Sequence, residues 1–128
     1  MVTIRNAKAK GSCFEYDTLE SLQAKFPDMY LTSKQGFVQQ YDLIDDQVKI
    51  AVECKRHKGF SWNELVKLYN KLMFHAPRSY TCYLIIKGNR QPTLVMYNRG
   101  NGYVMKDFED LFGIPFIKHT PIRRKQNV

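Results

Sequence analysis

Residues 41–58 read YDLIDDQVKIAVECKRHK, and this stretch decides the fold that the sequence predicts. Residues 41–44 and 48–55 are two strand-like runs, in which apolar side chains recur at alternate positions. Residues 45–47, Asp-Asp-Gln, lie between the two runs and are of types that favour turns. The two runs are therefore predicted to pair as an antiparallel hairpin.

The hairpin brings acidic side chains of both strands together. Folding about the turn places Asp42 opposite Ala51 or Val52, within one diagonal step of Glu53. Side chains alternate along a strand, so Glu53 and Lys55 share one face, while the apolar residues of the second run share the other. We therefore expect a compact cluster of Asp42, Glu53 and Lys55.

This cluster has the chemistry of a metal site for phosphodiester hydrolysis. Two adjacent carboxylates raise each other's pKa unless a cation lies between them, and hard oxygen ligands favour Mg²⁺ or Mn²⁺. Such an ion polarises a phosphoryl oxygen, and a lysine beside it orients water or offsets developing charge. The expected ligands are Asp42, Glu53 and the backbone carbonyl of Cys54, with Lys55 as the lysine. A surface hairpin with a cross-strand salt bridge fits the same spacing.

A third acid is expected from the first helix, which we predict over residues 12–25. Ser12 and Glu15 have the spacing of a capping box, which begins a helix. Glu15 also lies on the apolar stripe of this helix, the face that packs on a sheet. A glutamate on an inward face needs a partner, so we expect Glu15 to approach the acids of the hairpin.

The remaining elements complete an α/β domain. We predict strands over residues 29–33, 79–87 and 92–97, a helix that begins with a Ser61–Glu64 capping box, and a short helix over residues 106–112. The order of helix, three strands, helix, two strands and short helix indicates a central mixed sheet flanked by helices. The aromatic side chains near the end of the chain are predicted to be core or dimer contacts: Phe108, Phe112 and Phe116.

Composition limits the possible classes of protein. The chain has 128 residues, which suits a single domain, and no run approaches the roughly 18 apolar residues of a membrane span. Its first residues lack a secretory leader, so we expect an intracellular protein. Three cysteines without CxxC spacing argue against a disulfide framework and a thiolate zinc site, and are predicted to be small buried apolar residues.

Charge favours nucleic acid as the partner. The chain has 20 Lys and Arg against 12 Asp and Glu, a net charge of +8, and the basic residues cluster near both ends and after residue 54. Contacts from Lys and Arg to phosphates release counterions and supply affinity. Solvated basic ends that aid solubility remain the alternative interpretation.

The site residues resemble a known nuclease pattern. Glu15 in a first helix, then Asp42, then the run Glu53-Cys54-Lys55 resembles the PD-(D/E)xK nuclease superfamily, which shares the fold of type II restriction endonucleases. Residues 6–22, NAKAKGSCFEYDTLESL, are similar to the first helix of archaeal-type Holliday junction resolvases. The resemblance extends from residue 5 to about residue 72.

The resemblance implies a role for each matching residue within a restriction-endonuclease-like core. Asp42 and Glu53 would be metal ligands, Lys55 the catalytic lysine and Glu15 an additional acid. The family also has a serine in the loop after the first strand, for which Ser33 is the candidate and Thr32 the alternative. The chain departs from the pattern at residue 41, where a tyrosine replaces the proline of the motif, which affects strand entry more than metal binding.

The resemblance and the length together predict a structure-selective enzyme. A chain of 128 residues holds little beyond a nuclease core, so elements that read bases are not expected. A four-way junction has approximate two-fold symmetry, and paired cuts need two active sites, which a homodimer supplies. We therefore expect a Mg²⁺-dependent endonuclease resolving Holliday junctions, with Mn²⁺ as a substitute and no small-molecule cofactor.

DNA contacts are expected from a flexible basic N-terminal arm (about residues 1–10), a basic C-terminal tail (about residues 118–128) and residues near the site. The candidate DNA-binding residues are Arg5, Lys8, Lys10, Lys34, Arg56 and Lys58. Two alternatives stay open. One is a nuclease that acts on flaps or DNA ends, and the other is a non-catalytic nucleic-acid-binding module whose acids form only salt bridges.

Overall fold

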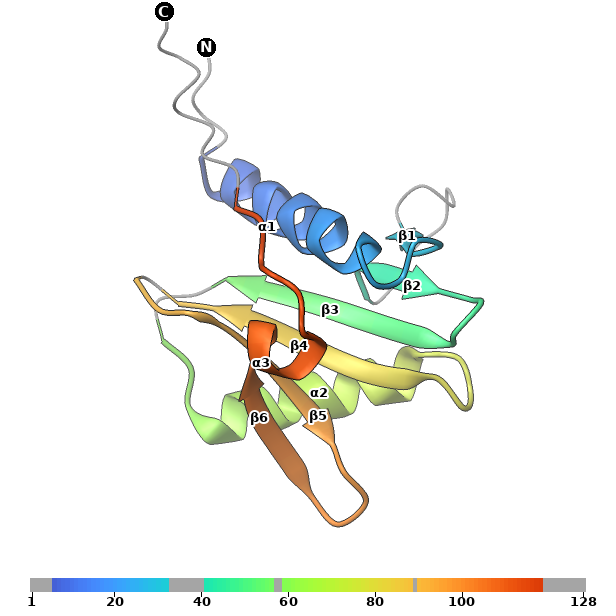
Figure 1. Cartoon of the computed structure of the whole chain (residues 1–128). Helices are drawn as coiled ribbons and strands as arrows, with labels where there is room; N and C mark the ends of the chain where they lie inside the picture. The colour runs from blue at the N-terminus through green and yellow to red at the C-terminus, as the bar shows by residue number, and fades with distance from the viewer. Residues whose placement is uncertain (1–5, 33–40, 57–58, 89, 119–128) are drawn as a thin grey trace, which may run out of the picture.

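The computed structural model describes residues 6–32, 41–56, 59–88 and 90–118, and of residues 6–12 the backbone alone. Helices lie on both faces of one six-stranded sheet (Figure 1). The elements are, in order, α1 (Asn6–Gln23), β1 (Tyr30–Leu31), β2 (Leu43–Asp45), β3 (Ile50–Arg56), α2 (Trp62–His75), β4 (Thr81–Lys87), β5 (Thr93–Asn98), β6 (Tyr103–Asp107) and α3 (Phe108–Phe112).

The sheet is mixed, and its strands lie in the order of the sequence, β1-β2-β3-β4-β5-β6. Neighbouring strands pair antiparallel, except that β3 and β4 run parallel. A parallel pair needs a crossover connection, and α2 supplies it. The predicted α/β class, with a central mixed sheet flanked by helices, is confirmed.

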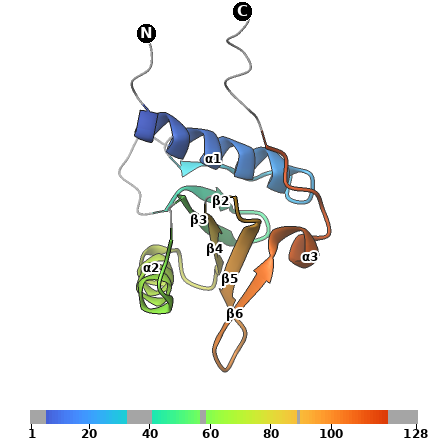
Figure 2. The same ribbon diagram turned by 90° about the vertical axis from the view of Figure 1, so that its left-hand side faces the viewer.

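Two apolar cores lie on the two faces of the sheet. The first lies between the sheet and helices α1 and α3, and the second between the sheet and α2 (Figure 2). Phe108 and Phe112 of α3 are buried in the first core, so they are core residues as predicted. The predicted capping box of α2 is confirmed, since the Ser61 hydroxyl accepts the Glu64 N–H and the Glu64 carboxylate accepts the Ser61 N–H.

The predicted hairpin is confirmed as β2 and β3, which pair antiparallel with Leu43 opposite Val52. Asp45, which we predicted in the turn, is instead the last residue of β2 and is 1% exposed. Its side chain still forms the turn, because Oδ1 accepts the N–H groups of Gln47 at 2.8 Å and Val48 at 3.2 Å.

Helix α1 begins at Asn6, six residues before the predicted start at Ser12. Ser12 is therefore inside the helix, and the predicted capping box with Glu15 is wrong. The physical reason is that alanine and lysine, which dominate residues 6–10, are strong helix formers and outweigh the single glycine at residue 11. Residues 6–10, expected in a flexible arm, are helical, and residues 1–5 and 119–128 lie outside the described residues.

Strand β6 was missed by the sequence analysis, which predicted two strands after α2 where the structure has three. The segment NRGNG at residues 98–102 turns the chain between β5 and β6, with Gly100 at a φ of 60°. The ring of Tyr103 packs 5.6 Å from that of Tyr69, and its hydroxyl donates to Asn70 Oδ1 at 2.7 Å. These tertiary contacts hold β6, whose sequence YVMKD has no clear alternation.

The cysteines are free thiols. Cys54 and Cys82 are buried as predicted, whereas Cys13 on α1 is only half-buried. Within the described ranges, no helix combines the length and the apolar character needed to cross a bilayer.

The cores predict which aromatic residues stabilise the fold. We expect Phe108→Ala to lower the free energy of unfolding by about 3–5 kcal/mol, because the ring is fully buried and its loss leaves a cavity. Phe74→Ala is the matched control, since that ring is 82% exposed, and we expect a change within about 0.5 kcal/mol. Urea unfolding followed by circular dichroism measures both. Equal losses in the two variants would contradict the assigned core.

Candidate functional site

The edge of β3 is the centre of the candidate site. Strand β2 pairs with β3 only opposite Ile50–Val52, whereas β4 pairs with β3 along its full length to Arg56. Among the described residues, the second half of the outer edge of β3 therefore has no strand partner. Asp42, the residue before β2, lies at this point: its N–H donates to the Val52 carbonyl at 2.9 Å.

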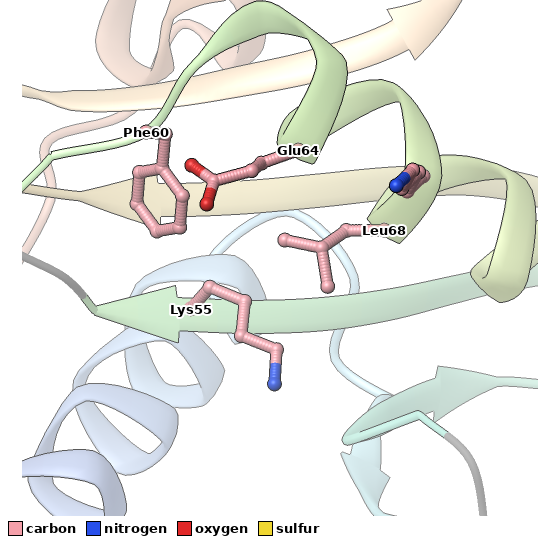
Figure 3. A pocket seen from close by; sticks show the side chains of 5 residues that line it. Lys55, Phe60, Glu64 and Leu68 are labelled. Carbon is pink, nitrogen blue, oxygen red and sulfur yellow. The ribbon is translucent and has the colours of Figure 1, made fainter.

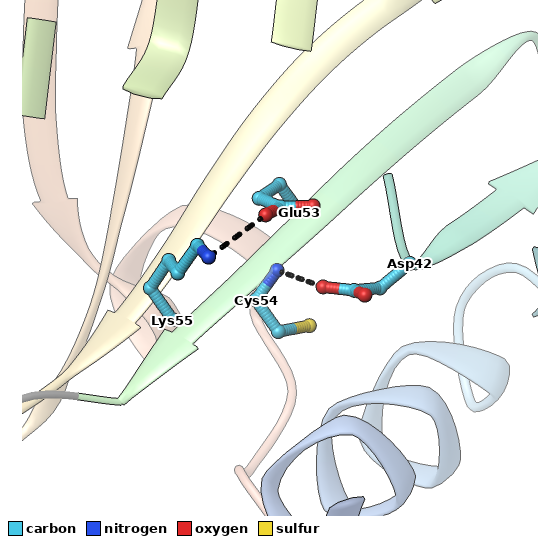
Figure 4. A network of polar contacts seen from close by, with 4 residues as sticks. All are labelled: Asp42, Glu53, Cys54 and Lys55. Atoms are coloured by element: carbon cyan, nitrogen blue, oxygen red, sulfur yellow. Dashed lines mark hydrogen bonds and ion pairs between the residues drawn. The ribbon is translucent and has the colours of Figure 1, made fainter. Parts of the chain in front are cut away.

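The carboxylate of Asp42 continues this edge with a side-chain hydrogen bond. Asp42 Oδ2 accepts the N–H of Cys54 at 2.8 Å, in the place that a strand carbonyl would take (Figure 4). A strand residue presents its N–H and C=O to the same side, so the Cys54 carbonyl also points to the open edge. The carboxylate is thus fixed beside the Cys54 backbone.

Glu53 and Lys55 lie beside Asp42, as the alternation of β3 predicts. The Asp42 N–H bonds to the Val52 carbonyl, so Asp42 lies at the level of Val52 and next to Glu53, as the predicted hairpin requires. Lys55 Nζ lies 3.5 Å from Glu53 Oε2 (Figure 4), and the two side chains are 43% and 16% exposed. The lysine is accessible to a substrate, while the glutamate is largely enclosed.

Glu15 reaches the cluster from α1, which packs over β3 through buried apolar side chains of both elements (Figure 1). The Glu15 and Glu53 carboxyls both lie near enough to Asp42 for its negative charge to act on them. Three carboxyls from α1, the start of the hairpin and β3 therefore gather around Asp42. The structure brings together Glu15, Asp42, Glu53 and Lys55.

The crowding of acids changes their proton affinity. Burial, and then the negative charge of Asp42, raise the pKa of Glu53 to about 8 and that of Glu15 to about 7, while Lys55 acts in the opposite direction. One lysine does not neutralise the cluster. A bound cation would favour the charged form of both glutamates.

Cys54 places its backbone, not its thiol, in the site. Its side chain is buried in the core between α1 and the sheet. Burial raises the pKa of the Cys54 thiol well above its usual value, which disfavours the thiolate that binds metals. The predicted contribution of a carbonyl oxygen is compatible with this geometry.

The oxygen donors are of the kind that Mg²⁺ and Mn²⁺ prefer: carboxylates and a backbone carbonyl. In the described part of the chain, however, no three His, Cys, Asp or Glu side chains are already arranged to hold a metal ion. Glu53 is paired with Lys55, and Asp42 is bonded to the Cys54 amide. The donor chemistry fits a hard divalent cation.

Thr32 has a role that the sequence did not indicate. Its N–H donates to the Asp42 carbonyl at 2.9 Å, and its buried hydroxyl donates to the Tyr41 carbonyl at 2.6 Å. Thr32 therefore anchors the backbone that carries the Asp42 carboxylate. The contact joins the end of β1 to the start of the hairpin, a pairing for which the sequence carries no local signal.

Several predicted site residues are not placed by the structure. Ser33 and three of the candidate DNA-binding residues lie outside the described residues: Arg5, Lys34 and Lys58. Lys8 and Lys10 belong to the first turns of α1, where the backbone alone is described. Arg56 is the exposed last residue of β3.

A hollow of about 360 Å³ lies beside Lys55, between β3 and α2. Figure 3 shows the stem of Lys55 below Phe60, Glu64 and Leu68, with its ammonium pointing away from Phe60 and Glu64. The volume is at the small end of the range of ligand pockets. This hollow was not expected from the sequence, because it depends on how α2 packs against the sheet.

Comparison with protein-family models, with curated proteins and with solved structures finds no match for this chain.

The acid cluster predicts that the metal-free protein loses stability as pH rises. Glu15 and Glu53 have raised pKa values, so between about pH 4.5 and 8 the folded state binds more protons than the unfolded state. The free energy of unfolding therefore falls across this window. Glu53→Gln should make the fall shallower, as measured by urea unfolding in EDTA at pH 5, 6, 7 and 8.

The control for this experiment is Asp28→Asn, which changes an exposed acid in the connection between α1 and β1. We expect it to leave the pH slope of wild type unchanged. A Glu53→Gln slope identical to that of wild type would contradict the raised pKa.

Proposed function

We propose that this protein is a metal-dependent endonuclease of the PD-(D/E)xK type that cuts branched DNA such as four-way junctions. The observation that carries the proposal is the meeting of Glu15, Asp42 and Glu53 at the open edge of β3, with Lys55 beside them. A restriction-endonuclease-like core is part of the proposal. The order of helix, antiparallel β1–β3, crossover helix α2 and parallel β4 supports it.

Each residue of the cluster has a proposed task. Asp42, Glu53 and the Cys54 carbonyl would hold the ion, and Glu15 adds a third negative charge beside the Asp42 carboxylate. When bound, Mg²⁺ or Mn²⁺ supplies Lewis-acid polarisation of a phosphoryl oxygen and lowers the pKa of a water. Lys55 would orient the attacking water or offset charge on the phosphate oxygens.

Branched DNA is proposed as the substrate because of charge and size. A net charge of +8 on 128 residues favours a polyanion, and the described part of the chain consists mostly of the sheet and its helices. Each chain supplies one cluster of acids, so paired cuts across a junction need a two-fold homodimer. Flaps and DNA ends are the alternative substrates of the same chemistry.

A second candidate function is a non-catalytic nucleic-acid-binding module. The Glu53–Lys55 ion pair favours it, together with the lack of a ready-made metal group among the described residues. In that case the acids and the lysine only stabilise the edge of β3. Metal binding separates the two functions.

The nuclease proposal predicts that the acids are essential. We expect Asp42→Asn and Glu53→Gln each to lower the rate of four-way-junction cleavage in Mg²⁺ by about 100-fold or more, because each removes a charged ligand. Asn and Gln preserve the shape of the replaced side chains, and an Asn oxygen can still accept the Cys54 N–H. Gel analysis of labelled junction, flap and linear duplex measures the rate and the preferred substrate.

Asp28→Asn is the matched control for the cleavage assay, and we expect it to cut at the wild-type rate. Asp42→Asn or Glu53→Gln at the wild-type rate would show that the site is wrongly assigned.

The same site predicts metal binding that depends on its carboxylates. Calorimetric titration of wild type with Mn²⁺ should show saturable binding, and Asp42→Asn should weaken it at least about 10-fold, because a hard cation loses a charged oxygen ligand. Asp28→Asn should bind as wild type does. Binding of DNA without any Mn²⁺ binding or cleavage would favour the non-catalytic module.

A further inference from the structure

Two cations lie side by side where the parallel strands end. Arg56, the last residue of β3, is in register with Lys87, the last residue of β4. Cys54 and Ile85, two residues earlier in each strand, are buried in the core beneath α1 and α3. Side chains two residues apart share a face, so Arg56 and Lys87 lie on this face too.

A third cation, Lys118, comes from the segment that follows α3. The segment is fixed just before it: the Phe116 N–H donates to Glu109 Oε2 at 3.0 Å, and the Ile117 N–H donates to Ser21 Oγ of α1 at 2.7 Å. Figure 2 shows the segment passing from α3 up to α1. These two bonds fix the backbone just before Lys118, which lines the same hollow as Lys87.

The three positive charges are close enough to act on one another. Burial, and then the charges of Lys118 and Arg56, lower the pKa of Lys87. The Lys87 ammonium donates to the carbonyls of Gly88 and Gln91, which are neutral groups. In the described part of the chain, none of the three cations is in an ion pair.

Two acids line the same hollow of about 320 Å³ as Lys87 and Lys118, and both are engaged elsewhere. Asp107 Oδ1 accepts the N–H groups of Glu109 and Asp110 at the start of α3, and Glu109 accepts the N–H of Phe116. Their carboxylates serve backbone amides rather than the cations. The charges that act on the Lys87 ammonium are those of Lys118 and Arg56.

We propose that Arg56, Lys87 and Lys118 form a phosphate-binding site that grips the backbone of the DNA strand close to the cut. The three like charges repel one another, and a bound polyanion removes this repulsion. Contacts of Lys and Arg with phosphates also release counterions, which adds to the affinity. Arg56 follows Glu53 by three residues on one strand, about 10 Å at about 3.3 Å per residue. This distance corresponds to about three nucleotides of stacked DNA, at about 3.4 Å for each.

The position relative to the cut rests on the proposed function, whereas the affinity for DNA backbone does not. Binding and cleavage are therefore measured separately. The test variant is Lys87→Gln/Lys118→Gln, and the matched control is Lys49→Gln/Lys71→Gln, which removes the same charge at the opposite end of β3 from Arg56 and on α2. Fluorescence anisotropy of a labelled four-way junction, without divalent cation and at several salt concentrations, gives Kd and the salt dependence.

The expected result is a slope of log Kd against log salt that is shallower by about 2 in the test variant, roughly 0.9 for each lost phosphate contact. At moderate salt the Kd should rise at least about 10-fold, against less than about 3-fold for the control.

The Lys87 ammonium also bonds to the carbonyls of Gly88 and Gln91, so replacing it could disturb this turn. Two single variants therefore control for a folding defect. Lys87→Arg keeps the charge and should bind as wild type does, and Lys118→Gln should show about half of the change in slope seen in the test variant. Equal slopes in the test and control variants would overturn the phosphate site, even if cleavage still depends on Asp42. Binding losses in the test variant, without any Asp42-dependent cleavage, would retain the phosphate site and reject the nuclease.

Discussion

The hydrogen bond between the Cys54 amide and the Asp42 carboxylate is the contact on which the site depends. Strand β2 leaves β3 after three residue pairs, and the carboxylate takes the next backbone donor in place of a strand. This substitution ends the pairing without leaving a buried N–H unsatisfied. It also holds the negative charge of Asp42 close to Glu53 and Glu15. The hydrogen bond that ends the strand pairing therefore also creates the repulsion between acids in the site.

This repulsion is maintained by packing from both sides. Helix α1 is held over β3 by buried apolar contacts, which keep Glu15 against Asp42, and Thr32 fixes the Asp42 backbone from β1. Burial and like charge raise the pKa of both glutamates, and the folded chain keeps them together nonetheless. Clusters of this kind are concentrated at functional sites, because a structural role is served better by apolar or paired groups.

Charge of the opposite sign gathers at the end of the same strand. The parallel pairing of β3 and β4 aligns Arg56 with Lys87, and the segment after α3 adds Lys118. The acid cluster at the edge of β3 and the cations at the end of this strand are thus only a few residues apart, as Glu53 and Arg56 show. Such an arrangement suits an extended polyanion, which can meet a divalent cation at one point and basic side chains at the next.

The sequence by itself determined what depends on short spacing. The β2–β3 hairpin, the shared face of Glu53 and Lys55, and the capped start of α2 follow from alternation, turn residues and a capping box, all of which act over a few residues. The tertiary structure alone decided the rest. A hydrogen bond set the Asp42 carboxylate on the Cys54 amide, pairing with β5 made a strand of β6, and Lys87 and Lys118 met from distant segments, because packing between elements leaves no local signal in the chain.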